Sequence, residues 1–192
     1  MHMDVSLVRS EVTMMQLEHD AISLLDIEME SVPCLVQTGD YARAVALSTG
    51  MPSEHIEPWV ETRLARQFIL TKDKPPVYDM IVDEAVFRKV VGDHKIMARQ
   101  LRAILEATDR ENLELRVLPA TPHWLEFGYY MMSADFTTYV AYVESPTSVV
   151  ILDDRYEVDP YRQYNGRLVR SSLEPDESVD LVATYAKEYA RA

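Results

Sequence analysis

Hydrophobic periodicity divides the N-terminal part of the chain into a helix, a strand and a second helix. Apolar residues three or four positions apart predict an amphipathic helix over 4–21, and His19 falls on its apolar stripe, where we expect a core or boundary histidine. In the run LLDIEM, at 24–29, apolar and acidic residues alternate as they do in a half-buried strand. A helix over 39–48 follows. Thr38 is placed to cap it, because its hydroxyl can accept a hydrogen bond from an amide of the first turn.

The middle of the chain continues with helices around one strand. Ser53 is the candidate cap of a helix that runs to about residue 70. The loop TKDKPP ends this helix, because proline disfavours helical geometry in the residue before it. The run VYDMIV predicts a strand and DEAVFRKVV a short helix, and Gly92 separates them from a helix over 93–107.

Extended patterns dominate the next part of the chain. Strands are expected in the β-branched or aromatic runs LELRVL, EFGYYMMS, TTYVAYVE and SVVIL, and helices over 157–172 and 175–190 follow. Because helices and strands mix without a regular βαβ alternation, the predicted fold class is α+β. We expect one domain over 1–192, with about six helices on a mixed or antiparallel sheet of about five to six strands. Residues 1–16 are expected to form a helical extension of it.

Composition and charge narrow the classes of partner. The 192 residues are 47% apolar, which suffices for a folded core, and they carry a net charge of −13. A chain this acidic repels a phosphate backbone, so nucleic acid is not expected as a direct partner. The sequence has neither a run of the roughly 18 apolar residues of a membrane span nor the pattern of a secretory signal. We therefore expect a cytoplasmic protein without a membrane partner.

The motifs of common metal and nucleotide sites are missing. The histidines show no HExxH spacing, and the single cysteine, Cys34, belongs to no CxxC pair. No GxGxxG or GxxxxGK[ST] motif occurs, and 5 glycines leave little material for a phosphate-binding loop. We therefore expect neither a metal nor a cofactor. No histidine lies near Cys34 in sequence to activate it, so we do not expect a nucleophile there.

Two polar side chains interrupt an apolar helix face. At about 100° per residue, Arg63 and Gln67 project from the middle of the apolar arc of the helix that starts near Ser53. An unpaired buried guanidinium costs several kcal/mol, so Arg63 must reach a carboxylate, a set of carbonyls, a ligand or the helix edge. A structural contact and a place in a ligand pocket both stay open.

The run YVAYVES offers a partner for such a cation. Along this strand Val140, Tyr142 and Glu144 share one face. We expect Glu144 to be a shielded carboxylate, either an acid–base group or the salt-bridge partner of Arg63 or Arg88. The tyrosines of the predicted strands either line a ligand cavity with their hydroxyls or pack beneath helices.

The motifs also occur in a recognisable order. The chain contains, in sequence, VPCLVQTGDYARAV, ETRLARQFILTKDKPPVYDMIVDEAVFRKVVGD, MARQLRAILEAT, LELRVLPA, YVES and LEPDES. This series resembles the domain of unknown biochemical function that usually follows the helix-turn-helix of actinobacterial XRE-family transcriptional regulators. The similarity covers about residues 17–190. It implies a regulatory or effector role, with a small-molecule ligand or a small partner protein as the target.

Several residues that match the family pattern are also those singled out by their chemistry. The matching residues are Gln37, Thr38, Tyr41, Arg63, Arg66, Gln67, Glu84, Arg88 and Glu144. We therefore expect a ligand-binding set made of Gln37, Thr38, Tyr41, Arg63, Gln67, Arg88 and Tyr142. The chain departs from the family in lacking the helix-turn-helix, in having a shorter loop after Pro119, and in carrying Cys34 where the family usually has glycine.

Two functions remain open from the sequence. The first is a ligand-sensing or protein-interaction domain that acts as an effector and does not itself bind DNA; a homodimer is compatible with it. The alternative is a stand-alone enzyme of specialised metabolism with an aromatic pocket. In that enzyme Glu144 or Glu84 would act as acid or base, and Arg63 would clamp an anion or a carbonyl.

Overall fold

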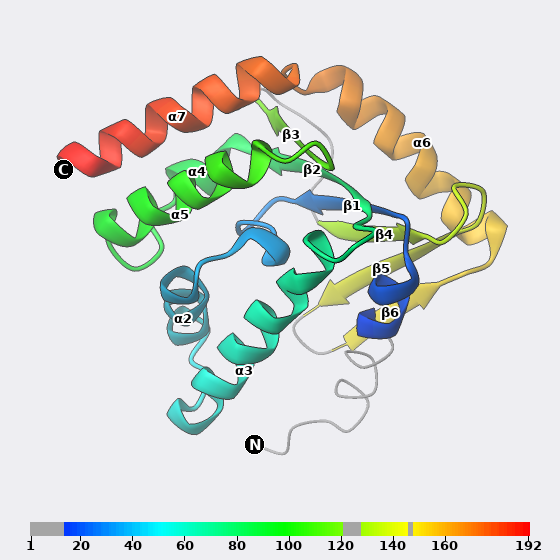
Figure 1. Ribbon diagram of the computed structural model, residues 1–192, viewed down its shortest axis with the longest axis horizontal. Coiled ribbons are helices and arrows are strands. Elements are labelled where there is room, and N and C mark those ends of the chain that lie inside the picture. The colour runs from blue at the N-terminus through cyan, green and yellow to red at the C-terminus, as the bar shows by residue number, and fades with distance from the viewer. Residues whose placement is uncertain (1–13, 121–127, 146–147) are drawn as a thin grey trace.

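The computed structural model describes residues 14–120, 128–145 and 148–192 (Figure 1). After helical residues 14–20, the elements in chain order are β1 (Ser23–Glu28), the 3-10 helix η1 (Cys34–Val36), α2 (Gly39–Ser48), α3 (Ser53–Arg66), the 3-10 helix η2 (Gln67–Leu70), β2 (Val77–Asp83), α4 (Glu84–Arg88), α5 (His94–Thr108), β3 (Leu113–Leu118), β4 (Tyr129–Ser133), β5 (Tyr139–Ser145), β6 (Ser148–Leu152), α6 (Arg155–Ser171) and α7 (Pro175–Arg191). The expected elements are therefore present, and the part of the predicted first helix before residue 14 lies outside the described residues.

The strands form one mixed six-stranded sheet in the order β3-β2-β1-β4-β5-β6. Strands β1, β2 and β3 are parallel, β4 pairs antiparallel with β1, and β5 and β6 each pair antiparallel with the strand before them. The α+β class and the mixed sheet are confirmed. The prediction that βαβ alternation is absent was wrong for the first half of the chain. There, helices connect β1 to β2 and β2 to β3, because parallel neighbouring strands need such crossovers.

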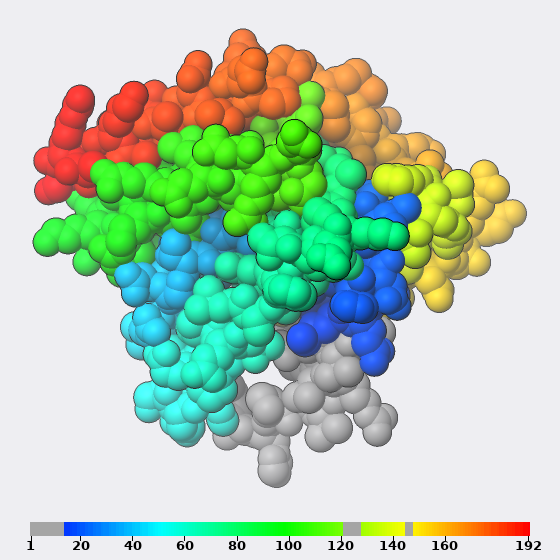
Figure 2. Space-filling view, viewed as in Figure 1, coloured from blue at the N-terminus to red at the C-terminus, as the bar shows by residue number. Residues whose placement is uncertain are grey.

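Helices cover both faces of the sheet. The larger core lies between one face and α2, η1, α5 and α7, and it includes Leu24, Tyr41, Phe87, Leu101 and Val182. A smaller core on the other face lies under α6, with Ile27, Ile81 and Leu168 among its members. Figure 2 shows α3, α5 and α7 on one face of the molecule. Strand β1 is therefore central in its sheet and covered on both sides.

Local signals were right at one predicted cap and wrong at the other. The Thr38 hydroxyl accepts a hydrogen bond from the Tyr41 amide at 3.3 Å, so Thr38 caps α2 as expected. Ser53 is instead the first residue of α3 and its hydroxyl contacts Glu54, because Pro52 occupies the capping position. The helix continues past Arg66 only as the 3-10 turn η2.

The first described helix packs with a different residue inward than its pattern predicts. His19 is exposed, so the expected core or boundary histidine was wrong, and Glu18 is buried at 1% exposure. No helix among the described residues combines the length and the apolar character that a membrane crossing requires.

Gly128 provides a test of the close approach between β4 and β1. A Cβ at this position would lie 2.5 Å from the Ile27 carbonyl oxygen, a backbone atom that cannot move aside by changing rotamer. We expect Gly128→Ala to lower the free energy of unfolding by about 1–3 kcal/mol in a denaturant titration. Gly166 lies on α6, where the nearest atom to an added Cβ is Arg170 Nη1 at 3.5 Å. Gly166→Ala should instead raise the free energy of unfolding by about 0.5–1 kcal/mol. Equal effects of the two variants would contradict the packing.

Candidate functional site

A set of polar side chains lies between the sheet and the segments that cover its larger core. We call it the polar cluster: Glu18, Asp26, Glu28, Cys34, Arg63, Arg66, Tyr78 and Tyr130. Its members come from helical residues 14–20, from β1, η1 and α3, and from β2 and β4. The cluster therefore joins six segments that are far apart in sequence.

The alternation of strand side chains explains how the sheet contributes. Leu24 belongs to the larger core, and alternate residues share a face, so Asp26 and Glu28 face the same side as Leu24. The register of β1 with β4 places Asp26 opposite Tyr130, and Tyr130 pairs in turn with Tyr142 on β5. Acids on one strand and tyrosines on its neighbours thus meet on the covered face.

The first charge pair of the cluster is complete. Arg66 donates through Nη2 to Glu18 Oε1 at 2.7 Å and through Nε to Oε2 at 3.0 Å. The Glu18 side chain is 1% exposed and that of Arg66 12%. Two parallel hydrogen bonds of this kind compensate both charges in a buried setting.

The other two carboxylates have no such partner. Asp26, 7% exposed, accepts a hydrogen bond from the Tyr78 hydroxyl at 2.8 Å. Burial raises the pKa of Asp26 to about 6 against the opposing effect of that bond. Glu28 is only partly exposed, and burial, followed by the charge of Asp26, raises its pKa well above the ordinary range. Within the described part of the chain, neither carboxylate forms an ion pair.

Arg63 lies near these carboxylates but is held by an aromatic ring. Its guanidinium carbon lies 3.9 Å from the centroid of the Trp59 ring, one helical turn earlier on α3. Its charge acts on both Asp26 and Glu28, although no ion pair joins them in the described residues. Arg63 therefore makes a cation–π contact with Trp59. Its guanidinium donates no hydrogen bond to the described residues.

Two buried polar atoms have no hydrogen-bond partner among the described residues: Tyr130 Oη and Gln37 Oε1. Tyr130 is 7% exposed and Gln37 3%. Burial raises the pKa of Tyr130, with the charges of Glu18 and Asp26 adding to the effect, so the hydroxyl lies within the polar cluster. An unsatisfied buried group costs about 1–3 kcal/mol, and each such atom in a folded protein needs a reason.

Glutamine and tyrosine side chains hold the segment that covers the cluster. Gln37 Nε2 donates to the Val32 carbonyl at 2.7 Å, and the Tyr41 hydroxyl accepts from the Val32 amide at 3.2 Å. Gln67 Nε2 donates to the Gln37 carbonyl at 2.6 Å. Gln100 binds the Val36 carbonyl at 2.8 Å and accepts from the Thr38 amide at 2.7 Å. These bonds fix residues 32–38 over the cluster.

The chain matches one family model. Residues 12–184 match the model of a domain of unknown function, DUF5753. The chain belongs to this family. No curated protein and no solved structure matches it. Membership in DUF5753 assigns no activity, so a function has to be argued from the site.

The predicted ligand residues of this DUF5753 domain separate into two groups. Gln37, Tyr41, Arg63 and Gln67 lie in or around the polar cluster, and Thr38 uses its hydroxyl in the α2 cap. Tyr142 is 5% exposed on the same face. Arg88, by contrast, lies where α4 meets α7, 3.6 Å from Glu84. The structure therefore does not bring Arg88 to the others.

The predicted acid–base residues are not assembled. Glu84 accepts from the Tyr185 hydroxyl at 2.6 Å and from the Ala120 amide at 2.7 Å, and the Tyr185 bond leads the effects that lower its pKa. Glu144 is exposed, so the expected shielded carboxylate was wrong. Among the described residues it pairs with neither Arg63 nor Arg88. Its charge does reach Glu28, whose pKa it helps to raise.

Sequence reasoning missed four members of the cluster, Glu18, Asp26, Glu28 and Tyr78, whereas Tyr130 is one of the strand tyrosines expected either to line a cavity or to pack beneath helices. The alternation in LLDIEM was recognised, but its acidic positions fit a solvated face. The signal lies in the position of β1, because acids on a central strand covered on both faces must be buried or paired.

Cys34 is a protonated thiol at neutral pH. Burial raises its pKa, and the opposing charges of Arg66 and Arg63 do not cancel that effect. A raised pKa suppresses the reactive thiolate, which agrees with the expectation that Cys34 is no nucleophile.

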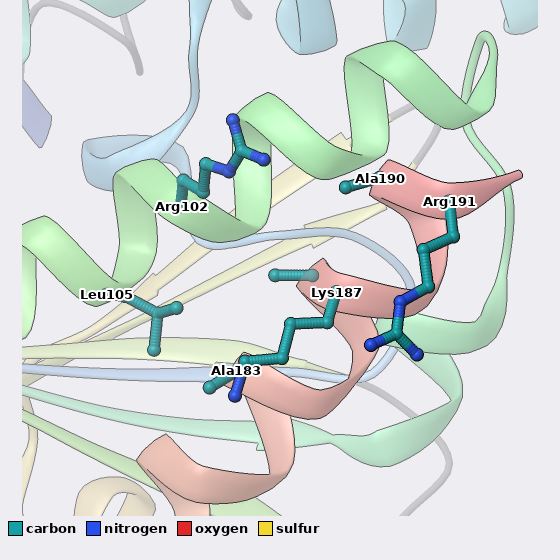
Figure 3. Close-up of a pocket in the computed structure, with 7 residues that line it drawn as sticks. Arg102, Leu105, Ala183, Lys187, Ala190 and Arg191 are labelled. Atoms are coloured by element: carbon teal, nitrogen blue, oxygen red, sulfur yellow. The ribbon is translucent and has the colours of Figure 1, made fainter.

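Two surface grooves lie away from the cluster. One, of about 330 Å³, runs between α5, which contributes Arg102 and Leu105, and α7, which contributes three alanines, Lys187 and Arg191 (Figure 3). The second, of about 260 Å³, is lined by β2, β3 and the start of α7. Neither contains a predicted ligand residue. Within the described residues, no group of three His, Cys, Asp or Glu side chains is placed to hold a metal ion.

Proposed function

We propose that this DUF5753 domain is a ligand-sensing effector domain, related to those of XRE-family regulators, that takes a small polar ligand into the polar cluster without transforming it. The observation that carries the proposal is a pair of buried atoms, Tyr130 Oη and Gln37 Oε1, that find no partner in the part of the chain that the structure describes. A ligand that satisfies them recovers a desolvation cost that the free protein bears.

The arrangement of the cluster fits reversible binding by a domain that changes state. The cover, residues 32–38, is held by side-chain to backbone hydrogen bonds from Gln37, Gln67 and Gln100. These bonds link the cluster to η2 and α5, so a ligand beneath the cover acts on elements that reach the surface. Binding the folded state adds RT ln(1 + [L]/Kd) to its stability, about 2.7 kcal/mol at a hundredfold excess over Kd.

The enzyme alternative has less support. The sequence predicted Glu84 or Glu144 as its acid or base, whereas Glu84 is engaged at the α4–α7 junction and Glu144 is exposed. Catalysis by these residues would need groups that lie in separate parts of the fold to act on one substrate.

The test is a thermal-shift screen of small polar metabolites against the wild-type protein and Tyr130→Phe. Tyr130→Phe removes an unsatisfied hydroxyl, so the free variant should be as stable as the wild type or more stable. Compounds that stabilise the wild type should bind the variant about tenfold or more weakly. Tyr156→Phe, at a position that is 88% exposed, is the matched control and should change neither property.

Two results would argue against the proposal. One is a clear loss of stability in free Tyr130→Phe, which would give the hydroxyl a structural role. The other is a set of stabilising compounds that all bind wild type and Tyr130→Phe equally, which would put their site elsewhere.

A further inference from the structure

The polar groups of the cluster that lack a partner among the described residues are mainly hydrogen-bond acceptors. Gln37 Nε2 donates to the Val32 carbonyl, which fixes the amide orientation and leaves Oε1, an acceptor, without a partner. Asp26 uses one oxygen to accept from Tyr78, and Glu28 accepts no hydrogen bond within the described residues. Of the two buried atoms that lack a partner among residues 14–120, 128–145 and 148–192, the Tyr130 hydroxyl can donate as well as accept. A ligand that complements these groups must supply mainly donors.

The charges of the cluster point the same way. With every group ionised, Glu18, Asp26 and Glu28 carry three negative charges, and Arg63 and Arg66 carry two positive ones. Arg66 is fully engaged by Glu18, and Arg63 stacks on Trp59. Asp26 and Glu28 can therefore both ionise without excess negative charge only if a further cation binds beside them, since burial raises the pKa of each in the free domain. The exposed Glu144 adds to the negative potential at Glu28.

We infer that the ligand of this site is a small organic cation with N–H donors, a primary ammonium, that binds between Asp26 and Glu28 and reaches the Tyr130 hydroxyl. The inference rests on the proposed function and names the chemistry of its ligand. An ammonium carries one charge and three donors, so it balances the cluster and satisfies its acceptors together.

The probe is n-butylammonium. It is compared with two small molecules that each lack one of its features and with an anion. Tetramethylammonium keeps the charge without a donor, 1-butanol keeps a donor without the charge, and acetate would seek Arg63 instead. Binding is measured by isothermal titration calorimetry at pH 7.5 and constant ionic strength, because a chain of net charge −13 attracts any cation weakly. We expect saturable one-to-one binding of n-butylammonium, and binding of the other three weaker by about tenfold or more.

Three variants locate the binding. Glu28→Gln and Asp26→Asn each remove one negative charge and should weaken n-butylammonium about tenfold or more. Glu61→Gln removes the same charge from an exposed position of α3 and should leave binding unchanged. Equal weakening by Glu61→Gln would show that only the overall charge matters, and would overturn the inference.

The remaining outcomes separate this inference from the proposed function. If acetate or a neutral compound binds in a Tyr130-dependent way while n-butylammonium does not, the ligand is not a cation and the sensing role stands. If neither these probes nor any compound of the metabolite screen binds in a Tyr130-dependent way, both ideas are wrong. Binding of n-butylammonium that is unaffected by Asp26→Asn and Glu28→Gln would also overturn the inference.

Discussion

Replacing Arg66 by methionine should lower the free energy of unfolding by about 3–5 kcal/mol. Arg66 is the bidentate partner of Glu18, whose side chain is 1% exposed. Without the guanidinium, Glu18 is a buried carboxylate with no counter-charge, and desolvation of such a group is costly. Urea unfolding at pH 7, followed by circular dichroism, measures the loss.

Two further variants make the Arg66 result specific. In the double variant Glu18→Gln and Arg66→Met no charge of the pair remains, so much of the lost stability should return. Arg43→Met removes a cation from an exposed pair with Glu57, where the arginine is 39% exposed, and should cost far less stability than Arg66→Met. If Arg66→Met cost no more than Arg43→Met, the buried pair would not stabilise the fold as described.

Replacing Asp26 by asparagine should have the opposite sign and stabilise the protein at neutral pH. The folded state raises the pKa of Asp26 from 3.8 to about 6, so it holds the proton more tightly than the unfolded chain does. The stability contributed by the protonated form is present below about pH 4 and is lost as the pH rises through about 6. At roughly 1.4 kcal/mol per pKa unit, the loss amounts to about 3 kcal/mol. The groups that act on Asp26 are Tyr78, Arg66, Glu18 and Arg63.

Asparagine cannot ionise but can still accept the hydrogen bond from Tyr78. Asp26→Asn should therefore unfold at higher urea concentration than the wild type at pH 7.5, by up to about 3 kcal/mol, with the difference shrinking towards pH 4.5. Asp73→Asn, at an exposed position, should follow the wild-type profile. A destabilised Asp26→Asn at pH 7.5 would mean that the charge of Asp26 supports the free fold.

The two predictions concern one site and have opposite signs of stability change. The pair of Glu18 and Arg66 stabilises the fold, whereas the charge of Asp26 costs stability that a neutral residue would restore. Proteins keep such costs where function needs them, which fits a site that waits for a ligand. Asp26→Asn should accordingly gain stability and lose n-butylammonium binding together.

Most elements could be predicted from local pattern. Thr38 capped α2 as expected, and the strand runs appeared where β-branched and aromatic residues cluster. The helix over 53–70 was predicted with the wrong cap, because proline at the preceding position displaced Ser53 from that role, and its last four residues form the 3-10 helix η2. These outcomes follow from interactions within a few residues of each position.

The candidate site was only partly predictable. Arg63 and Gln67 were noticed because polar groups on an apolar helix face contradict the pattern around them. Asp26 and Glu28 went unnoticed because alternation gives the two faces of a strand without saying which of them is covered. The expectation for Glu144 was wrong for the same reason, since this residue near the end of β5 is exposed whereas Ala141 and Tyr142 are buried.

The sequence by itself determined the α+β class, the run of helices and strands, and the presence of polar groups that needed partners. Only the tertiary structure decided that β1 lies in the middle of the sheet, with β2 and β4 as its neighbours. That position buries Asp26, places Tyr130 opposite it, and brings Arg66 to Glu18 across 48 positions of sequence. The physical reason is that desolvation and charge pairing depend on neighbours in space, and long-range strand pairing is what chooses them.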